Sequence, residues 1–241
     1  MEQFSRTISL VGQSAFDRVH QARVAVFGVG GVGGYVCEAL VRSGIAEIDL
    51  FDRDDVSISN LNRQIIALHS TIGQDKVDAM AARLKDINPD VRVNCRKMFY
   101  LPTNADEIDL SVYDFVVDTI AAKLELARRC EQGGIRFISA MGAGNKLDPS
   151  CLRIADITKT SVCPLARAMR VSCKKKGIRH MTVAYSLEPM HPPVQPIAEE
   201  SGRRKDIPGS TAFVPGAMGL LIASHVVRTL MAGDEPARPE G

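Results

Sequence analysis

Arg23-Val-Ala-Val-Phe27, followed at once by Gly28-Val-Gly30-Gly31-Val-Gly33, is the stretch that decides the fold of this chain. The first five residues are mostly apolar and β-branched, which is typical of a buried strand. The glycines match G-x-G-x-x-G, a tight turn that lets the backbone approach a phosphate-bearing nucleotide and directs helix amides at it. We therefore predict a nucleotide site at this turn, formed by Gly28, Gly30, Gly31 and Gly33.

The residues after the turn extend it into a βαβ unit. Residues 35–43 are predicted to be helical, with Gly44 as the stop, and Glu47-Ile-Asp-Leu-Phe51 is predicted to be a second strand. Asp52 follows this strand, 24 residues after Gly28, where a carboxylate can accept both ribose hydroxyls. By themselves the glycines and Asp52 favour NAD or FAD as the ligand.

Strands and helices continue to alternate, so we predict a doubly wound α/β fold with a mostly parallel sheet. The further predicted strands are 91–95, 113–117 and 136–140, and the helices are 76–87, 123–132 and 215–231. We expect an N-terminal helical arm (1–22), a Rossmann-like nucleotide-binding region (23–150), a mixed substrate-side extension of the same domain (151–231) and a disordered tail (232–241). The proline-containing segment 186–209 is predicted to be a flexible surface loop.

Composition sets only broad limits on function. The 241 residues are 45% hydrophobic and 24% charged, with a net charge of +2 that by itself indicates no partner. Six cysteines form no C-x-x-C pair, which argues against a zinc ribbon or a thioredoxin-like site. We find no signal peptide and no apolar run of 18 residues, and expect a cytoplasmic protein that does not associate with a membrane.

The polar loop from Asp52 to Gln64 changes the expected ligand. Arg63 lies in this loop and Lys76 lies 13 residues beyond it. A dehydrogenase has no need for these cations, whereas transfer of AMP to a carboxylate builds negative charge on the α-phosphate and on the departing pyrophosphate. Fixed cations stabilise that charge, and losing one such donor commonly costs on the order of a hundredfold to a thousandfold in rate. Asp118, at the end of the fourth strand, is the predicted magnesium ligand.

These residues resemble the ubiquitin-activating superfamily, which includes the bacterial ThiF and MoeB adenylyltransferases. The resemblance rests on the glycine turn, the D-x-D-x-V-x-x-S-N-L-N-R-Q stretch of residues 52–64, Gly73-Gln-Asp-Lys76 and Ile87-Asn-Pro89. It implies that Asp52 binds ribose and that the phosphates are contacted by a set of polar residues. That set consists of Asn60, Arg63 and Lys76. Asp54 and Gln64 are further predicted residues of the ATP site. It also implies that Arg6 enters the partner subunit's site, and hence a homodimer.

The second half resembles one branch of that superfamily, the bacterial tRNA threonylcarbamoyladenosine dehydratases. The matching blocks are residues 142–149, 156–160, 163–167 and 213–219. The resemblance implies ATP-dependent activation of the threonyl carboxylate of a modified adenosine in tRNA, followed by ring closure through the neighbouring carbamoyl group. Such chemistry needs no catalytic cysteine, and Cys163 is expected to be a buried apolar residue.

One segment departs from the family pattern of Asp, two residues, Asp, then Thr-x-x-Ala-Lys. This chain has only Asp118-Thr-Ile-Ala-Ala-Lys123, about three residues fewer. Either Asp118 is the magnesium ligand beside a shortened strand end, or that aspartate is missing and Ala121 takes its place. We favour the first alignment.

A tRNA substrate would also give a role to the basic residues after Cys163, since affinity for RNA comes largely from neutralising phosphates. The predicted RNA contacts are Arg167, Arg170, Lys174, Lys175, Lys176 and Arg179, while Lys159 and Arg167 are candidates to approach the substrate carboxylate. Three alternatives stay open: activation of a ubiquitin-like sulfur carrier, a nicotinamide oxidoreductase, and a nucleotide-binding module without catalysis. The pattern also leaves room for a helper protein.

Overall fold

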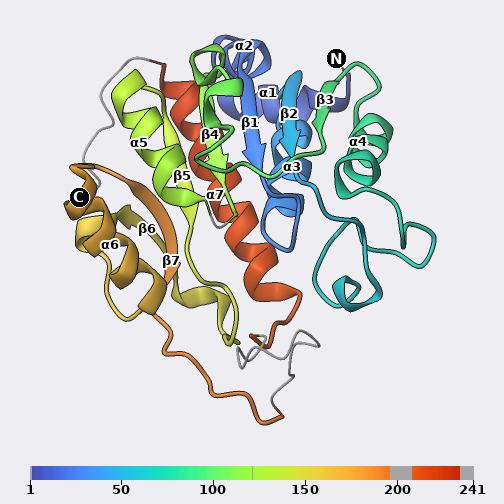
Figure 1. Ribbon diagram of the computed structural model, residues 1–241. Coiled ribbons are helices and arrows are strands. Elements are labelled where there is room, and N and C mark those ends of the chain that lie inside the picture. The colour runs from blue at the N-terminus through green and yellow to red at the C-terminus, as the bar shows by residue number, and fades with distance from the viewer. Residues whose placement is uncertain (1, 121, 196–207, 234–241) are drawn as a thin grey trace.

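The structure is a computed structural model, and it describes residues 2–120, 122–195 and 208–233. One seven-stranded sheet runs through the molecule in the order β3-β2-β1-β4-β5-β7-β6 (Figure 1). Only β6 is antiparallel to its neighbour, so the predicted mostly parallel, doubly wound sheet is confirmed. The strands are β1 (Arg23–Phe27), β2 (Glu47–Phe51), β3 (Arg92–Arg96), β4 (Phe115–Asp118), β5 (Phe137–Ala140), β6 (Leu152–Asp156) and β7 (Thr182–Ser186).

Helices cover both faces of this sheet. One buried cluster packs α3, α4 and α7 against the strands, and another packs α5 and α6. The helices are α1 (Ser5–Val11), α2 (Gln13–Gln21), α3 (Gly33–Arg42), α4 (Lys76–Ile87), α5 (Lys123–Gly133), α6 (Pro164–Lys176) and α7 (Phe213–Ala232). Short 3-10 turns are η1 (Glu2–Phe4), η2 (Ile58–Asn60), η3 (Ala105–Glu107), η4 (Leu110–Val112), η5 (Pro149–Cys151) and η6 (Ile157–Lys159).

The register brings three strand ends together at one edge of the sheet. Phe27, the last residue of β1, is opposite Phe51 of β2 on one side and Asp118 of β4 on the other. Because parallel strands end at the same edge, the segments that follow β1, β2 and β4 meet there, as expected for a ligand site of a doubly wound sheet. This edge positions the candidate site.

The second half contains three elements that the sequence analysis did not assign: β6, α6 and β7. The ends of α6 do carry local signals, since Pro164 opens the helix and Gly177 closes it with a left-handed φ of +73°. Strand β6 lies at the edge of the sheet and its side chains are mostly half-buried, so its sequence shows a weaker apolar pattern. The predicted loop 186–209 and tail 232–241 lie partly outside the described residues.

The last helix, α7, is long and apolar enough to span a bilayer by length and composition alone. It packs against α3 and α2, however, and most of the tested window is buried within the protein. A glycine makes this packing close, because a Cβ at Gly219 would lie only 2.5 Å from the carbonyl oxygen of Val32. We therefore interpret α7 as a core helix.

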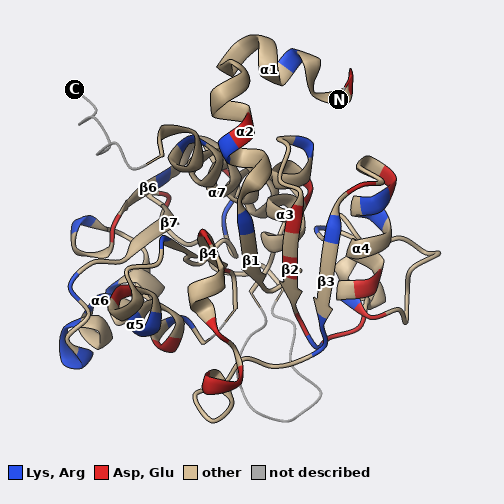
Figure 2. Ribbon diagram, turned by 90° about the horizontal axis from the view of Figure 1, so that it is seen from above, with Lys and Arg blue, Asp and Glu red and all other residues tan. Residues whose placement is uncertain are grey.

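The N-terminal arm has a different character. No residue of α1 is buried, and Leu10 is 86% exposed. Figure 2 shows α1 standing away from the sheet, whereas α2 is anchored through Phe16 and Val19. A free-standing helix this short gains little from its own hydrogen bonds, so the exposed face of α1 is available to another molecule.

Candidate functional site: a nucleotide pocket at the sheet edge

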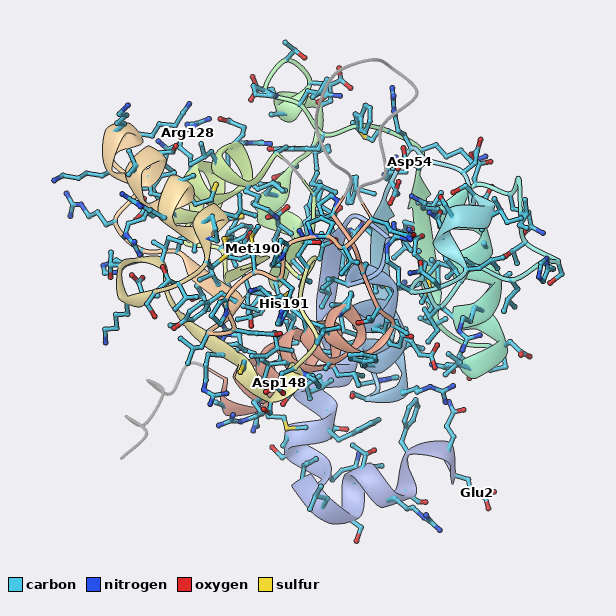
Figure 3. The ribbon with its side chains drawn as sticks, turned by 90° about the horizontal axis from the view of Figure 1, so that it is seen from below. Glu2, Asp54, Arg128, Asp148, Met190 and His191 are labelled. Carbon is cyan, nitrogen blue, oxygen red and sulfur yellow. The ribbon has the colours of Figure 1, made fainter. Side chains whose placement is uncertain are left out.

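A cavity of about 190 Å³ lies at the strand ends described above. Figure 3 looks at the molecule from below and labels Asp54, one of its residues. The lining residues are Gly28, Gly30, Phe51, Asp52, Arg53, Asp54, Lys76, Met98, Phe99, Tyr100, Thr119 and Ile120. A larger cavity of about 280 Å³ adjoins it through Phe51 and Met98 but contains none of the predicted site residues. The smaller cavity is therefore the candidate site.

The glycine turn has the shape that a phosphate needs. Gly28 has a φ of +93°, and a Cβ there would lie 2.5 Å from the Thr119 hydroxyl. A Cβ at Gly33 would lie 1.9 Å from the carbonyl oxygen of Gly28, so only glycine fits either position. The helix that follows, α3, begins without a side-chain cap. Its first amide, that of Gly33, can therefore bind an anion, whereas the amide of Gly34 already donates to the carbonyl oxygen of Gly30 (2.9 Å).

Asp52 stands where the sequence places a ribose-binding carboxylate. One of its oxygens accepts a hydrogen bond from the amide of Val29 (2.7 Å) and the other accepts from the amide of Asp54 (3.0 Å). The same side chain lines the cavity. Asp52 thus ties the glycine turn to the loop after β2, and retains lone pairs for a ligand hydroxyl.

Lys76 is the buried cation of the pocket. It is only 6% exposed and is the first residue of α4, where the helix dipole disfavours a positive charge. Its ammonium lies 3.0 Å from Oδ2 of Asp54, and both residues line the cavity. A lysine held in so unfavourable a position is better suited to binding an anion than to stabilising the helix.

Arg63 lies beside the turn but is not among the cavity-lining residues. Its Cγ would be 3.4 Å from a Cβ at Gly31, which packs the arginine stem against the third glycine. Nη1 donates to the carbonyl oxygen of Ser59 (2.8 Å) and to Oδ1 of Asn62 (2.9 Å). The other two guanidinium nitrogens make no hydrogen bond to a described residue, so they are available for a ligand.

Two further predicted residues of the ATP site, Asn60 and Gln64, differ in what their side chains do. Asn60 is buried, and its Oδ1 accepts from the amide of Ser57 in a capping box, so its side chain shapes the loop. Gln64 is only 6% exposed, and its Oε1 has no hydrogen-bond partner among the described residues. Its amide faces Gly30. A buried acceptor oxygen left without a donor beside a glycine turn is expected where a ligand supplies a hydrogen-bond donor.

Asp118 differs from its predicted role. Its side chain is completely buried and is absent from the cavity lining. Oδ1 accepts from the amide of Ile120 (3.0 Å), while Oδ2 accepts from the ammonium of Lys123 (3.0 Å) and the hydroxyl of Ser139 (2.5 Å). A magnesium ligand must turn an oxygen toward the phosphates. Asp118 therefore does not fit the predicted magnesium site, and its carboxylate anchors the turn after β4 instead.

The alternative alignment placed the missing aspartate at Ala121, which lies outside the described residues. Within the part of the chain that the structure describes, no group of three His, Cys, Asp or Glu side chains could hold a metal ion. The carboxylates that line the cavity are Asp52 and Asp54. Arg6 lies on α1 and is not among the lining residues of its own chain's cavity.

Sequence reasoning missed several residues of the pocket. The hydroxyl of Thr119 donates to the carbonyl oxygens of Phe27 (2.9 Å) and Gly28 (3.1 Å) and so holds the turn closed. Phe99 also lines the cavity, with the guanidinium of Arg53 3.4 Å from its ring centre. The only signal was the run Met98-Phe-Tyr100 after β3, which by composition alone looks like core.

Comparison with known proteins agrees with this geometry. The ThiF family model matches residues 4–240, and this chain belongs to the ThiF family. It is 41% identical to the tRNA threonylcarbamoyladenosine dehydratase of Bacillus subtilis, covering 99% of this chain and 98% of that protein. Its identity to the Escherichia coli dehydratase is 32%, over 96% and 94% of the two chains. The predicted resemblance is confirmed.

Solved structures give the same result. The crystal structure of E. coli tRNA N6-threonylcarbamoyladenosine dehydratase, TcdA, in complex with AMP matches with a TM-score of 0.86, covering 96% of this chain and 94% of that one. The complex of the same enzyme with ATP matches with a TM-score of 0.84.

Proposed function

We propose that this protein is an ATP-dependent tRNA-modifying dehydratase. It adenylates the threonyl carboxylate of threonylcarbamoyladenosine in tRNA and closes a ring with release of AMP and pyrophosphate. The observation that carries the proposal is a glycine-turn cavity containing the buried ammonium of Lys76, in a chain similar over its whole length to enzymes of that name. Structures of such an enzyme with AMP and ATP support a nucleotide ligand for this cavity.

The reaction needs no nucleophile from the protein, because the substrate supplies both attacking groups. A carboxylate oxygen attacks the α-phosphorus of ATP, the bond to the β-phosphate oxygen breaks, and pyrophosphate leaves. The neighbouring carbamoyl group then attacks the activated carbonyl carbon and AMP leaves with the former carboxylate oxygen, so the nucleoside loses one water. This agrees with the state of the thiol of Cys163, which is buried and does not line the cavity.

The pocket residues then have defined tasks. The amides of the glycine turn and the start of α3 bind phosphate, and Asp52 orients the ribose. Lys76 and Arg63 oppose the charge that develops on the α-phosphate and the leaving group, which is where fixed cations lower a barrier most. Both cations are held before the ligand arrives, Lys76 by Asp54 and Arg63 by Ser59 and Asn62.

Magnesium would enter with the nucleotide, since this ion keeps several waters and binds mainly through phosphate oxygens. The buried and fully paired Asp118 offers it no ligand. The carboxylates open to the cavity are those of Asp52 and Asp54, and we assign to magnesium no step that depends on Asp118.

The basic face of α6 is the proposed contact for tRNA. Figure 2 shows Lys and Arg gathered on this helix. Arg167, Lys174, Lys175 and Lys176 are exposed and form no ion pair with another described residue. Arg170 is an exception, because its Nη1 donates to the carbonyl oxygens of Ile157 and Thr160 and is used inside the fold. The free cations can neutralise RNA phosphates.

A homodimer in the cytoplasm completes the proposal. The exposed α1 would carry Arg6 into the pocket of the partner subunit. Within one chain, no residue of the N-terminal arm lines the cavity.

The direct test is incubation with ATP, magnesium and tRNA bearing threonylcarbamoyladenosine, followed by mass spectrometry of the nucleosides. We expect ATP-dependent loss of one water from the modified adenosine. Unchanged tRNA, together with transfer of AMP to the C-terminus of a sulfur-carrier protein, would replace this function by carrier activation.

A further inference from the structure

Asn62 lies next to Arg63 in sequence, yet its amide faces two directions. Oδ1 accepts from Nη1 of Arg63 (2.9 Å), and Nδ2 donates to the carbonyl oxygen of Ser210 (2.9 Å), 148 residues away. These two partners fix the orientation of the amide. If it were flipped, Nδ2 would face the donor Nη1 of Arg63 and Oδ1 would face the carbonyl oxygen of Ser210. A single exposed side chain, that of Asn62, thus joins the arginine beside the glycine turn to the segment that precedes α7.

The far end of this connection is also held. Gly209 exchanges two hydrogen bonds with Asn145: the amide of Asn145 donates to the carbonyl oxygen of Gly209 (2.7 Å), and the amide of Gly209 donates to Oδ1 of Asn145 (2.7 Å). The carbonyl oxygen of Asn145 accepts from the amide of His191 (2.9 Å). Figure 3 labels His191. Asn145 therefore connects the segment after β7 with the segment before α7.

The backbone of Asn145 indicates that these contacts are specific. Its φ is +57°, a left-handed conformation that asparagine tolerates better than most other residues. Its neighbour Gly144 has no room for a side chain, because a Cβ there would lie 2.8 Å from Cβ of Pro208. Close packing on one side and paired hydrogen bonds on the other hold residues 208–210 in one place.

The same segment leads directly into contacts with the nucleotide turn. A Cβ at Gly31 would touch both Arg63 Cγ (3.4 Å) and Pro215 Cβ (3.5 Å), so the first turn of α7, the arginine stem and the glycine turn meet at one point. The stem of Arg63 is held by packing, while its guanidinium is directed by Ser59 and Asn62.

We infer that Asn62 is a positioning residue for Arg63, and that through Ser210 it makes the position of this arginine depend on the segment held by Asn145. The inference rests on the proposed function, in which Arg63 contacts the phosphates of ATP. If the inference holds, the gain in affinity that the phosphates of ATP provide requires Asn62 and Arg63 together.

A double-mutant cycle tests this, with the affinities of adenosine and ATP measured by calorimetry for the full chain. The phosphate increment is the ratio of the two affinities. We expect Arg63→Ala to reduce it about tenfold, as for a lost charge-assisted hydrogen bond. Asn62→Ala should reduce it several-fold without changing adenosine affinity, and should add nothing in the Arg63→Ala background.

Two further variants separate the arms of the amide. Asn62→Asp can still accept from Arg63 but cannot donate to Ser210, so it should lower the phosphate increment for ATP, though by less than Asn62→Ala does. Asn145→Gly keeps the left-handed backbone and removes Oδ1, and should reproduce the Asn62→Asp effect on the phosphate increment in weaker form. Gln132→Ala is the matched control, since Gln132 accepts from Nη1 of Arg128 (2.7 Å) on the surface of α5.

The outcomes are distinct. Multiplicative effects of Arg63→Ala and Asn62→Ala, in variants with wild-type melting temperatures, would overturn the positioning role while leaving the proposed function intact. A wild-type protein that binds ATP no better than adenosine would overturn the phosphate site, and the positioning role with it. If the double variant loses no more of the phosphate increment than Arg63→Ala loses alone, the inference is supported.

Discussion

Two lysine–aspartate pairs flank β1, and each has an Nζ to Oδ2 distance of 3.0 Å. In the pair after β2, the Asp54 side chain is 55% exposed and both partners line the nucleotide cavity. In the pair after β4, Asp118 is fully buried and also satisfied by Ser139. The same two functional groups at the same separation thus line the candidate cavity in one place and are buried within the fold in the other. Access of the oxygens to the cavity, rather than position at a strand end, makes the difference.

The largest expected effect comes from breaking the buried pair. Asp118→Ala would leave the ammonium of Lys123 buried without its carboxylate, which typically costs about 3–5 kcal/mol of stability. We expect a correspondingly lower free energy of unfolding in urea. A control with Asp118→Leu and Lys123→Met removes both charges and should recover most of that loss. If Asp118→Ala were as stable as the wild type but lost its magnesium dependence, the structural role would be refuted.

The next effect comes from the ligand side of the comparison. Lys76→Ala should lower the rate of AMP formation on the order of a hundredfold to a thousandfold, because a fixed cation at the developing charge is lost. Its free energy of unfolding should change little, since Asp54 is solvated once its partner is gone. Steady-state kinetics and urea unfolding on the same preparation separate the two quantities. A near-normal rate in a folded Lys76→Ala protein would contradict the proposed pocket.

A smaller effect is expected at the exposed carboxylate. Asp54→Asn also leaves a buried ammonium, that of Lys76, but it should cost less stability than Asp118→Ala, because the Asp54 side chain is 55% exposed and water screens this pair. The contrast with Asp118→Ala is the direct measure of what burial adds at equal distance. Equal losses in the two variants would show that burial is not what separates the pairs.

The smallest effect extends the comparison to a third carboxylate, that of Glu188, which is bound by amides rather than by lysine. Although burial by itself raises its pKa, hydrogen bonds from the amides of Leu147 and Asp148 and from His191 leave the pKa below its usual value. A lowered pKa stabilises the folded state above the unfolded pKa of about 4.3, and the gain is lost as pH falls through the folded value. The stability advantage of the wild type over Glu188→Gln should therefore shrink as the pH is lowered below about 4.3. A constant difference down to pH 3 would contradict this.

How far the sequence led can be judged from particular elements. Helix α4 (Lys76–Ile87) and strand β2 (Glu47–Phe51) have the bounds that were predicted, because apolar periodicity and a terminal Asn-Pro are local signals. The strands β6 and β7 were not predicted. In α6 the proline and glycine signals were present but were not used.

In the candidate site, too, some features were predicted from local sequence and others were not. The glycine turn, Asp52 and Lys76 were predicted and line or shape one cavity. Asp118 was expected there because it ends a strand, but whether a strand-end carboxylate faces a ligand depends on which donors surround it, and Ser139 and Lys123 come from other elements.

The sequence by itself determined that the chain forms a doubly wound sheet with a nucleotide turn and two cations beyond the second strand, since those features follow from local order and spacing. Only the tertiary structure decided which aspartates line the candidate cavity, and that Asn62 joins Arg63 to a segment 148 residues away. Such contacts depend on how distant segments pack, and no short-range pattern encodes that.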